Sequence, residues 1–146
     1  MCPPCHGWAL FEYAVRTEII NPARSRLGKA KVWIQSSAVG QAAGAVGDFV
    51  SNYREMRDAN TIGADKYFHC RANCQAAQRG PAGEATAGVV SDAREFVDAK
   101  LKGDPDSASK ADQAANRAGR AGGRADPNGA CVEICLIYRP PALDER

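Results

Sequence analysis

The sequence predicts a small, mostly α-helical domain, and three observations carry this prediction. Twenty-seven of the 146 residues are alanine, which favours helices but offers little side chain to bury. Several segments place apolar residues at the spacing of one helix face. Six cysteines form three close pairs, and two of these pairs have members four residues apart, about one helical turn. We therefore expect short Ala/Gly-rich helices that cysteine pairs can staple together.

The composition limits the size of the core and the classes of partner. Leu, Ile, Val and Phe together number 24 of the 146 residues, a small share for a well-filled core. The net charge of +2 gives no basic excess, so nucleic acid is not expected as a partner. No basic region followed by an apolar stretch and a cleavage site is visible near Met1, so no secretory signal is predicted.

The N-terminal half is expected to be a helical, small-residue-rich segment over residues 1–59. A short helix is predicted for Trp8–Ile20, ended by Asn21-Pro22. Beyond a basic stretch, a second helix is expected around Val32–Val50. Its charge-free run, Val32–Gly47, is too short and too polar to be an obvious membrane-spanning helix.

The remaining residues, 60–146, are expected to form a helical module that contains the paired cysteines, together with 1–59 in one domain. Asp65 is predicted to be the N-cap of a helix that ends near Arg79, before Gly80-Pro81. The clearest helix runs from about Glu84 to Leu101, with Asp92 and Glu95 mostly opposite its apolar stripe. That stripe, expected to be buried, comprises Val89, Val90, Ala93, Phe96, Val97 and Leu101.

The last third of the chain gives weaker signals. A helix with an alanine stripe is expected from Ser107, and residues 119–129 read as a Gly/Arg/Asp/Pro loop. The apolar run from Cys131 to Tyr138 fits either one or two helical turns or a strand.

The cysteines allow several interpretations. Cys70/Cys74 and Cys131/Cys135 can face each other as two interhelical disulfides, which is the favoured hypothesis for a chain with so thin a core. The same four thiolates can instead bind one zinc ion, or remain free thiols. Apart from that minority zinc interpretation, no cofactor is predicted.

A further pair lies at the N-terminus. Cys2-Pro-Pro-Cys5-His6 spells the attachment pattern of c-type haem. Its context is poor, because no export signal precedes it, and a local disulfide or uninvolved cysteines are favoured over haem.

His69 is the leading catalytic candidate. A carboxylate from Asp92 or Glu95 on the next helix can orient it as a general base. The competing and favoured interpretation is a helix histidine hydrogen-bonded at a packing interface. Asp112 and Asn116 share a face that can be an active-site edge, although a solvated face is favoured. An enzyme is therefore the less favoured class.

Gly40, Gly44 and Gly47 allow close approach of a second helix. Associating membrane helices use this pattern, and so do tightly packed soluble helices or a helix lying on a membrane surface. The soluble interpretation is the simplest on these residues alone.

Several short sequence motifs, taken together, indicate a family. They are DKYFHCRANC (65–74), GPAGE (80–84), SDARE (91–95), KGD (102–104) and ADQAANR (111–117), followed by Cys131, Cys135 and YRP (138–140). Over roughly residues 60–141 they resemble a module at the C-termini of bacterial Rhs-repeat polymorphic toxins. The resemblance implies a type VI secretion effector, carried by an Rhs shell and neutralised by a cognate immunity protein.

The resemblance leads to a functional hypothesis. We expect an antibacterial toxin that permeabilises the inner membrane of the target cell through the helix around Val32–Val50. One alternative is a toxin enzyme acting through His69 and a carboxylate. Another is a non-catalytic, cysteine-stapled interaction module.

Overall fold

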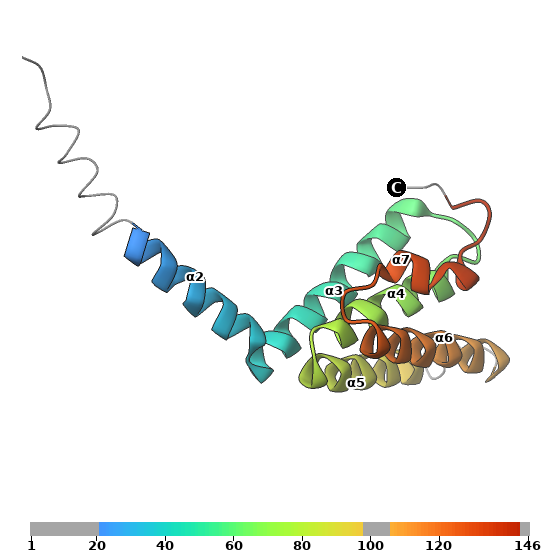
Figure 1. Cartoon of the computed structure of the whole chain (residues 1–146). Helices are drawn as coiled ribbons and strands as arrows, with labels where there is room; N and C mark the ends of the chain where they lie inside the picture. Colours follow the sequence, from blue (N-terminus) through green and yellow to red (C-terminus); the bar gives the residue numbers. More distant parts are fainter. Residues whose placement is uncertain (1–20, 98–105, 144–146) are drawn as a thin grey trace, which may run out of the picture. The chain divides into compact units, whose positions relative to one another are not determined.

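The computed structural model describes residues 21–97 and 106–143, which are helical wherever they are regular (Figure 1). The predicted mostly α-helical class is confirmed. The predicted helix Trp8–Ile20 lies outside these residues. The elements are α2 (Asn21–Ser36), α3 (Ala38–Ala59), α4 (Asp65–Gln78), α5 (Pro81–Val97), α6 (Asp106–Ala125), α7 (Cys131–Ile134) and the 3-10 helix η3 (Leu136–Tyr138).

The expected single helix over Val32–Val50 is two helices. Contacts divide the chain into residues 1–35 and 36–146, and the boundary falls where α2 gives way to α3. Ser37 has extended backbone, and its hydroxyl oxygen accepts a hydrogen bond from the Gly40 N–H at 3.1 Å. This N-cap interaction begins α3 afresh and separates it from α2. Among the described helices, none has the length and apolar character needed to cross a membrane.

Helix α4 is the centre of residues 36–146. It packs against α3, α5, α6, α7 and η3. Ten of its fourteen residues are therefore buried, and they lie on every side of the helix. It ends near the predicted place, because Gly80 adopts a φ of 118° that favours glycine, and Pro81 begins α5. In Figure 1, α5 and α6 lie side by side at one side of this bundle.

The predicted loop over residues 119–129 is wrong for its first half, because α6 continues to Ala125. Gly119 and Gly123 lie on the same face as buried Ala115 and pack directly on α4. A Cβ at Gly119 would collide with the carbonyl oxygen of Cys70, and one at Gly123 with that of Cys74. Close packing of the two backbones therefore outweighs the low helix propensity of glycine.

Helix α5 buries the opposite face from the one expected. Its buried residues follow four-residue spacing at Gly83, Ala87, Ser91 and Glu95. As far as Phe96 the predicted apolar stripe is largely outside, with Val89 71% and Phe96 65% exposed. The burial of Val97 and the predicted end of the helix at Leu101 lie outside what the structure describes. A Cβ at Gly83 would collide with the Ala76 carbonyl oxygen, so the small residues of α5 set its approach to α4.

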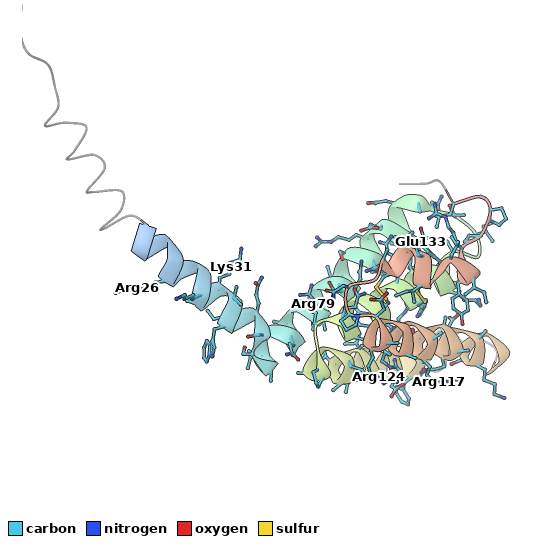
Figure 2. All side chains as sticks on the ribbon, in the orientation of Figure 1. Arg26, Lys31, Arg79, Arg117, Arg124 and Glu133 are labelled. Atoms are coloured by element: carbon cyan, nitrogen blue, oxygen red, sulfur yellow. A yellow bond between two sulfur atoms is a disulfide. The ribbon has the colours of Figure 1, made fainter. Side chains whose placement is uncertain are left out.

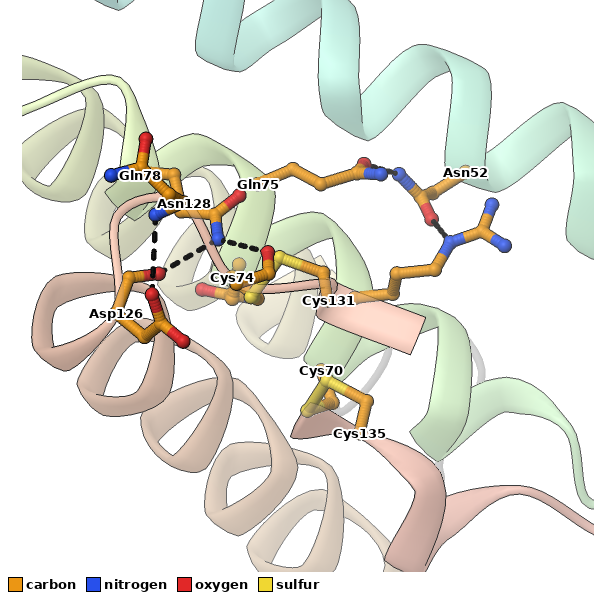
Figure 3. Close-up of a disulfide and its surroundings, with 12 residues drawn as sticks. Asn52, Cys70, Cys74, Gln75, Gln78, Asp126, Asn128, Cys131 and Cys135 are labelled. Carbon is orange, nitrogen blue, oxygen red and sulfur yellow. Dashed lines mark hydrogen bonds between the residues drawn. A yellow bond between two sulfur atoms is a disulfide. The ribbon is translucent and has the colours of Figure 1, made fainter. Parts of the chain in front are cut away.

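Two disulfides attach the C-terminal segment to α4. Cys70 bonds Cys135 and Cys74 bonds Cys131, with Cα–Cα distances of 5.7 and 5.8 Å (Figure 3). The two pairs connect in nested order, so the two facing helical turns run antiparallel at this place. Because disulfide sulfurs are not thiolates, this arrangement leaves the four cysteines without zinc-binding capacity.

Candidate functional site

An apolar groove lies between α3 and α5. It has a volume of about 410 Å³, and buried Phe68, His69 and Ala72 of α4 contribute to its lining. The α3 and α5 residues around it are mostly apolar: Val46, Phe49, Val50, Asn52, Tyr53, Arg54, Met56, Val90 and Arg94.

Large apolar side chains remain exposed at this groove. Val46 is 48% exposed, Val50 43% and Tyr53 52%, although all three lie on α3 beside the bundle core. Val89 and Phe96 are further exposed apolar residues of α5, outside the groove lining. Exposed apolar residues gathered at a groove indicate a candidate interaction site.

A second candidate is a buried polar cluster of His69, Glu95, Asp112 and Asn116, which α4, α5 and α6 bring together. His69 Nδ1 lies 3.1 Å from Asn116 Oδ1 and 4.0 Å from Glu95 Oε1. His69 Nε2 lies 3.9 Å from Asp112 Oδ2. The His69 side chain is only 2% exposed, so its polar atoms depend on these neighbours.

Burial lowers the pKa of His69 below its ordinary value, and the positive charge of Arg94 lowers it further. Asp112 and the hydrogen bond to Asn116 oppose this change without reversing it. The imidazole is therefore neutral at physiological pH, which leaves one ring nitrogen with a lone pair.

Asn73 supports this cluster from the middle of α4. Its amide nitrogen donates to Asn116 Oδ1 at 2.8 Å and to the His69 carbonyl at 2.9 Å. Its Oδ1 accepts from the Ser91 hydroxyl at 3.0 Å and from Arg120 Nη1 at 2.7 Å. The amide thus satisfies polar groups from α4, α5 and α6 at once.

Polar contacts also join α3 to α4. Asn52 donates to Gln75 at 2.6 Å (Figure 3). Asn52 also accepts from Arg71, which pairs with Glu55. Elsewhere Arg124 of α6, labelled in Figure 2, pairs with Glu84 of α5. The helices are therefore joined by hydrogen bonds and ion pairs as much as by apolar contact.

The structure separates the three proposed catalytic residues. Glu95 is buried beside His69, whereas Asp92 is exposed and accepts from Gln113 at 3.1 Å. Asp92 lies one residue outside the buried spacing of α5, so it cannot orient His69 from that face.

The three glycines proposed for membrane-helix packing do not act as one surface. Gly40 donates to Ser37, and Gly44 lies against the Arg79 guanidinium, which forms an ion pair with Asp48 at 2.5 Å. Gly47 is exposed and has open space beside it. The N-terminal Cys2, Cys5 and His6 lie outside the described residues.

Sequence reasoning missed several members of both sites. Asn116 is fully buried, and Asp112 lies against His69, so the preferred interpretation of a solvated face is wrong. The four-residue spacing of Ala87, Ser91 and Glu95 was an available signal for the buried face of α5. No pattern in the sequence singled out Asn73 as a buried hydrogen-bonding residue.

The fold and these sites define a class: a disulfide-linked helical bundle with a polar core and an exposed apolar groove. A family model described as serum amyloid A protein matches residues 36–146. A serum amyloid A protein of the duck Anas platyrhynchos is 49% identical over 105 residues, covering 72% of this chain and 75% of the relative. That of the horse, Equus caballus, is 50% identical over 119 residues, covering 75% and 97%. The chain belongs to the serum amyloid A family.

This family membership overturns the predicted bacterial toxin. The relatives named above come from a bird and a mammal, and a bovine protein (Bos taurus) is 47% identical over 128 residues. The Rhs shell, the immunity protein, type VI delivery, killing of a target cell and action at its inner membrane are therefore wrong. The runs between residues 65 and 117 lie inside the serum amyloid A match, so they are part of that family's sequence.

Proposed function

We propose that this chain binds phospholipid surfaces, such as that of a lipoprotein particle, through the α3–α5 groove. The observation that carries the proposal is the groove itself, where Val46, Val50 and Tyr53 stay exposed beside an apolar volume of about 410 Å³. Membership of the serum amyloid A family supports it, since that family implies association with high-density lipoprotein.

The groove has the chemistry of a lipid-binding face. Its apolar residues can enter the boundary between headgroups and acyl chains, where burial of their surface is favourable. Arg54 and Arg94 are the cationic residues of its lining, and guanidinium groups bind phosphate well. An amphipathic surface of this kind lies on a lipid layer and need not cross it.

Flotation of the full chain with phosphatidylcholine vesicles tests the proposal. The variant Val46→Asp/Val50→Asp places two carboxylates in the groove, at positions already partly exposed to water. Because moving an aspartate into an apolar phase costs several kcal/mol, we expect vesicle affinity to fall by at least about tenfold.

The matched control is Ile62→Asp/Ile137→Asp, which makes the same charge change outside the groove. Both isoleucines are more exposed than the groove valines, at 98% and 85%. Circular dichroism should show that all variants keep their helix content. Equal loss of binding in both double variants, or none in the groove variant, would contradict a lipid site in the groove.

A further inference from the structure

Three helices bring three metal-ligating side chains to one buried place. His69 of α4, Glu95 of α5 and Asp112 of α6 each offer one ligand atom, and these atoms all lie within 4.8 Å of one another. The three side chains are 2%, 7% and 17% exposed. Ser109 donates to Glu95 Oε2 at 3.0 Å and Lys66 pairs with Asp112, and a cation held between the three side chains would offset the remaining cost of burying them.

The hydrogen-bond network determines which nitrogen of His69 carries the proton. Arg120 can only donate, so the Asn73 atom 2.7 Å away is the amide oxygen. The other Asn73 atom is therefore the amide nitrogen, and it donates to Asn116 Oδ1 at 2.8 Å. That oxygen cannot donate, so His69 Nδ1, 3.1 Å away, must carry a hydrogen.

His69 Nε2 is consequently left with a free lone pair. It is buried and has no hydrogen-bond partner within the described part of the chain, and it lies 3.9 Å from Asp112 Oδ2. Arg94 Nη1, 3.4 Å from Nδ1, could donate only to an unprotonated Nδ1, and the shorter contact of Nδ1 with Asn116 Oδ1 at 3.1 Å favours the protonated form. A neutral imidazole with one nitrogen bonded to a supporting group is the form in which histidine binds metals.

We propose that His69 Nε2, Glu95 and Asp112 bind a divalent transition-metal ion, for which Zn²⁺ is the best fit. One imidazole nitrogen and two carboxylate oxygens suit Zn²⁺, whereas Ca²⁺ takes six to eight oxygen ligands. Bonds of about 2.0–2.2 Å place tetrahedral ligands roughly 3.4 Å apart, so the side chains must move inward by about an ångström. Glu95 must move furthest, because its Oε1 lies 4.0 Å from Nδ1 and has to turn towards Nε2. Asn116 is the outer-shell partner that orients the imidazole.

The surrounding charges decide how tightly the ion binds. Glu95 and Asp112 attract a cation, whereas Arg94 opposes it. Lys66 Nζ lies 3.5 Å from Asp112 Oδ1, and its side chain is 36% exposed, so it can turn towards water when the ion arrives. His69 also borders the apolar groove, which provides a path for entry.

The test uses the full, oxidised, lipid-free chain carrying Cys2→Ser, Cys5→Ser and His6→Gln. These changes remove competing N-terminal ligands. Because the chain has two histidines, replacing His6 leaves His69 as its single histidine. We expect isothermal titration with Zn²⁺ to give one equivalent bound. Nitrogen-15 NMR should show a protonated Nδ1 before addition and a large shift of Nε2 on binding.

Variants in that background separate the proposed site from adventitious binding. Asp112→Asn and His69→Gln should each weaken Zn²⁺ binding at least about tenfold, the usual minimum for loss of a metal ligand or its support. Asp92→Asn, which changes an exposed carboxylate of α5, should bind as tightly as the background. Lys66→Ala should bind more tightly, because the ion no longer displaces an ammonium from Asp112.

Asp112→Asn decides the matter if His69→Gln fails to fold, since Asp112 is the most exposed of the three ligands. No heat and no Nε2 shift in a large excess of Zn²⁺ would overturn the proposal. Undiminished binding by Asp112→Asn would overturn it equally. Vesicle flotation without metal is independent of this result, so the two proposals can fail separately.

Discussion

Single buried amides hold this bundle together to an unusual degree. Asn52, Asn73 and Asn116 are all buried, and each makes side-chain hydrogen bonds to a different helix. In a chain with few large apolar residues, these bonds specify which helix faces meet. Each buried asparagine therefore depends on its hydrogen-bond partners, and losing one side chain leaves other buried polar groups unsatisfied.

Asn73→Leu tests that dependence. The change keeps the branching and the number of side-chain heavy atoms, but it takes the Asn73 partner from the Ser91 hydroxyl and Arg120. It also removes one of the two hydrogen bonds to Asn116 Oδ1, which keeps His69 Nδ1. Since an unsatisfied buried polar group costs about 1–3 kcal/mol, we expect the free energy of unfolding to fall by about 3 kcal/mol. Urea denaturation measures this change. Gln113→Leu, which removes an exposed hydrogen bond to Asp92, should change stability by less than about 0.5 kcal/mol.

At the scale of elements, small residues decide which faces pack. Helix α6 meets α4 through Ala115, Gly119 and Gly123, and α5 meets it through Gly83 and Ala87. Glycine lowers the intrinsic stability of a helix, but here it lets two backbones approach until Cβ atoms would collide. Local propensity and tertiary packing therefore make opposite demands on the same positions.

Alanine substitution distinguishes those two demands. Gly119→Ala and Gly123→Ala each place a methyl against an α4 carbonyl, and we expect a loss of about 1–3 kcal/mol in unfolding free energy. Gly47→Ala makes the same change within α3, where nothing lies within 4 Å of the new Cβ. It should instead stabilise the chain by up to about 1 kcal/mol. Thermal unfolding followed by circular dichroism compares the three, and stabilisation by all of them would argue against close packing of α6 on α4.

At the scale of the whole molecule, the disulfides compensate for a thin core. One disulfide joins cysteines separated by 65 positions and the other joins cysteines separated by 57, so both close long loops in the unfolded chain. Closing a loop of about 60 residues is worth about 4 kcal/mol in the chain-entropy model. Once one disulfide exists, the second closes only a short ring and adds less.

Serine variants of the two pairs test this unequal contribution. Cys70→Ser/Cys135→Ser and Cys74→Ser/Cys131→Ser each leave one tether, and each should cost about 2–3 kcal/mol in urea. Replacing all four cysteines opens the long loop, so the second step should cost more than the first. Equal costs for both steps would contradict the loop-closure explanation.

Much of the secondary structure follows from local sequence. Alanine content and helical spacing predict the class, and Gly80-Pro81 ends α4 as expected. Asp65 begins α4, but Ala64 and not Asp65 is its N-cap, so that part of the prediction is wrong. The four-residue spacing of Cys70/Cys74 and Cys131/Cys135 predicts two facing disulfides as the favoured arrangement. These features depend only on residues within a turn or two of one another, which is why the sequence reveals them.

The sequence by itself therefore determined the helical class, the approximate extent of α4 and the possibility of two disulfides. Only the tertiary structure decided which face of α5 is buried, that α6 runs to Ala125, and that His69 meets Glu95 and Asp112. Apolar periodicity shows how apolar and polar residues alternate around one helix, whereas burial depends on how closely a neighbouring helix can approach. Here that approach is set by glycines, alanines and a shared amide network, which connect residues far apart in the chain and leave Val89 and Phe96 of α5 outside.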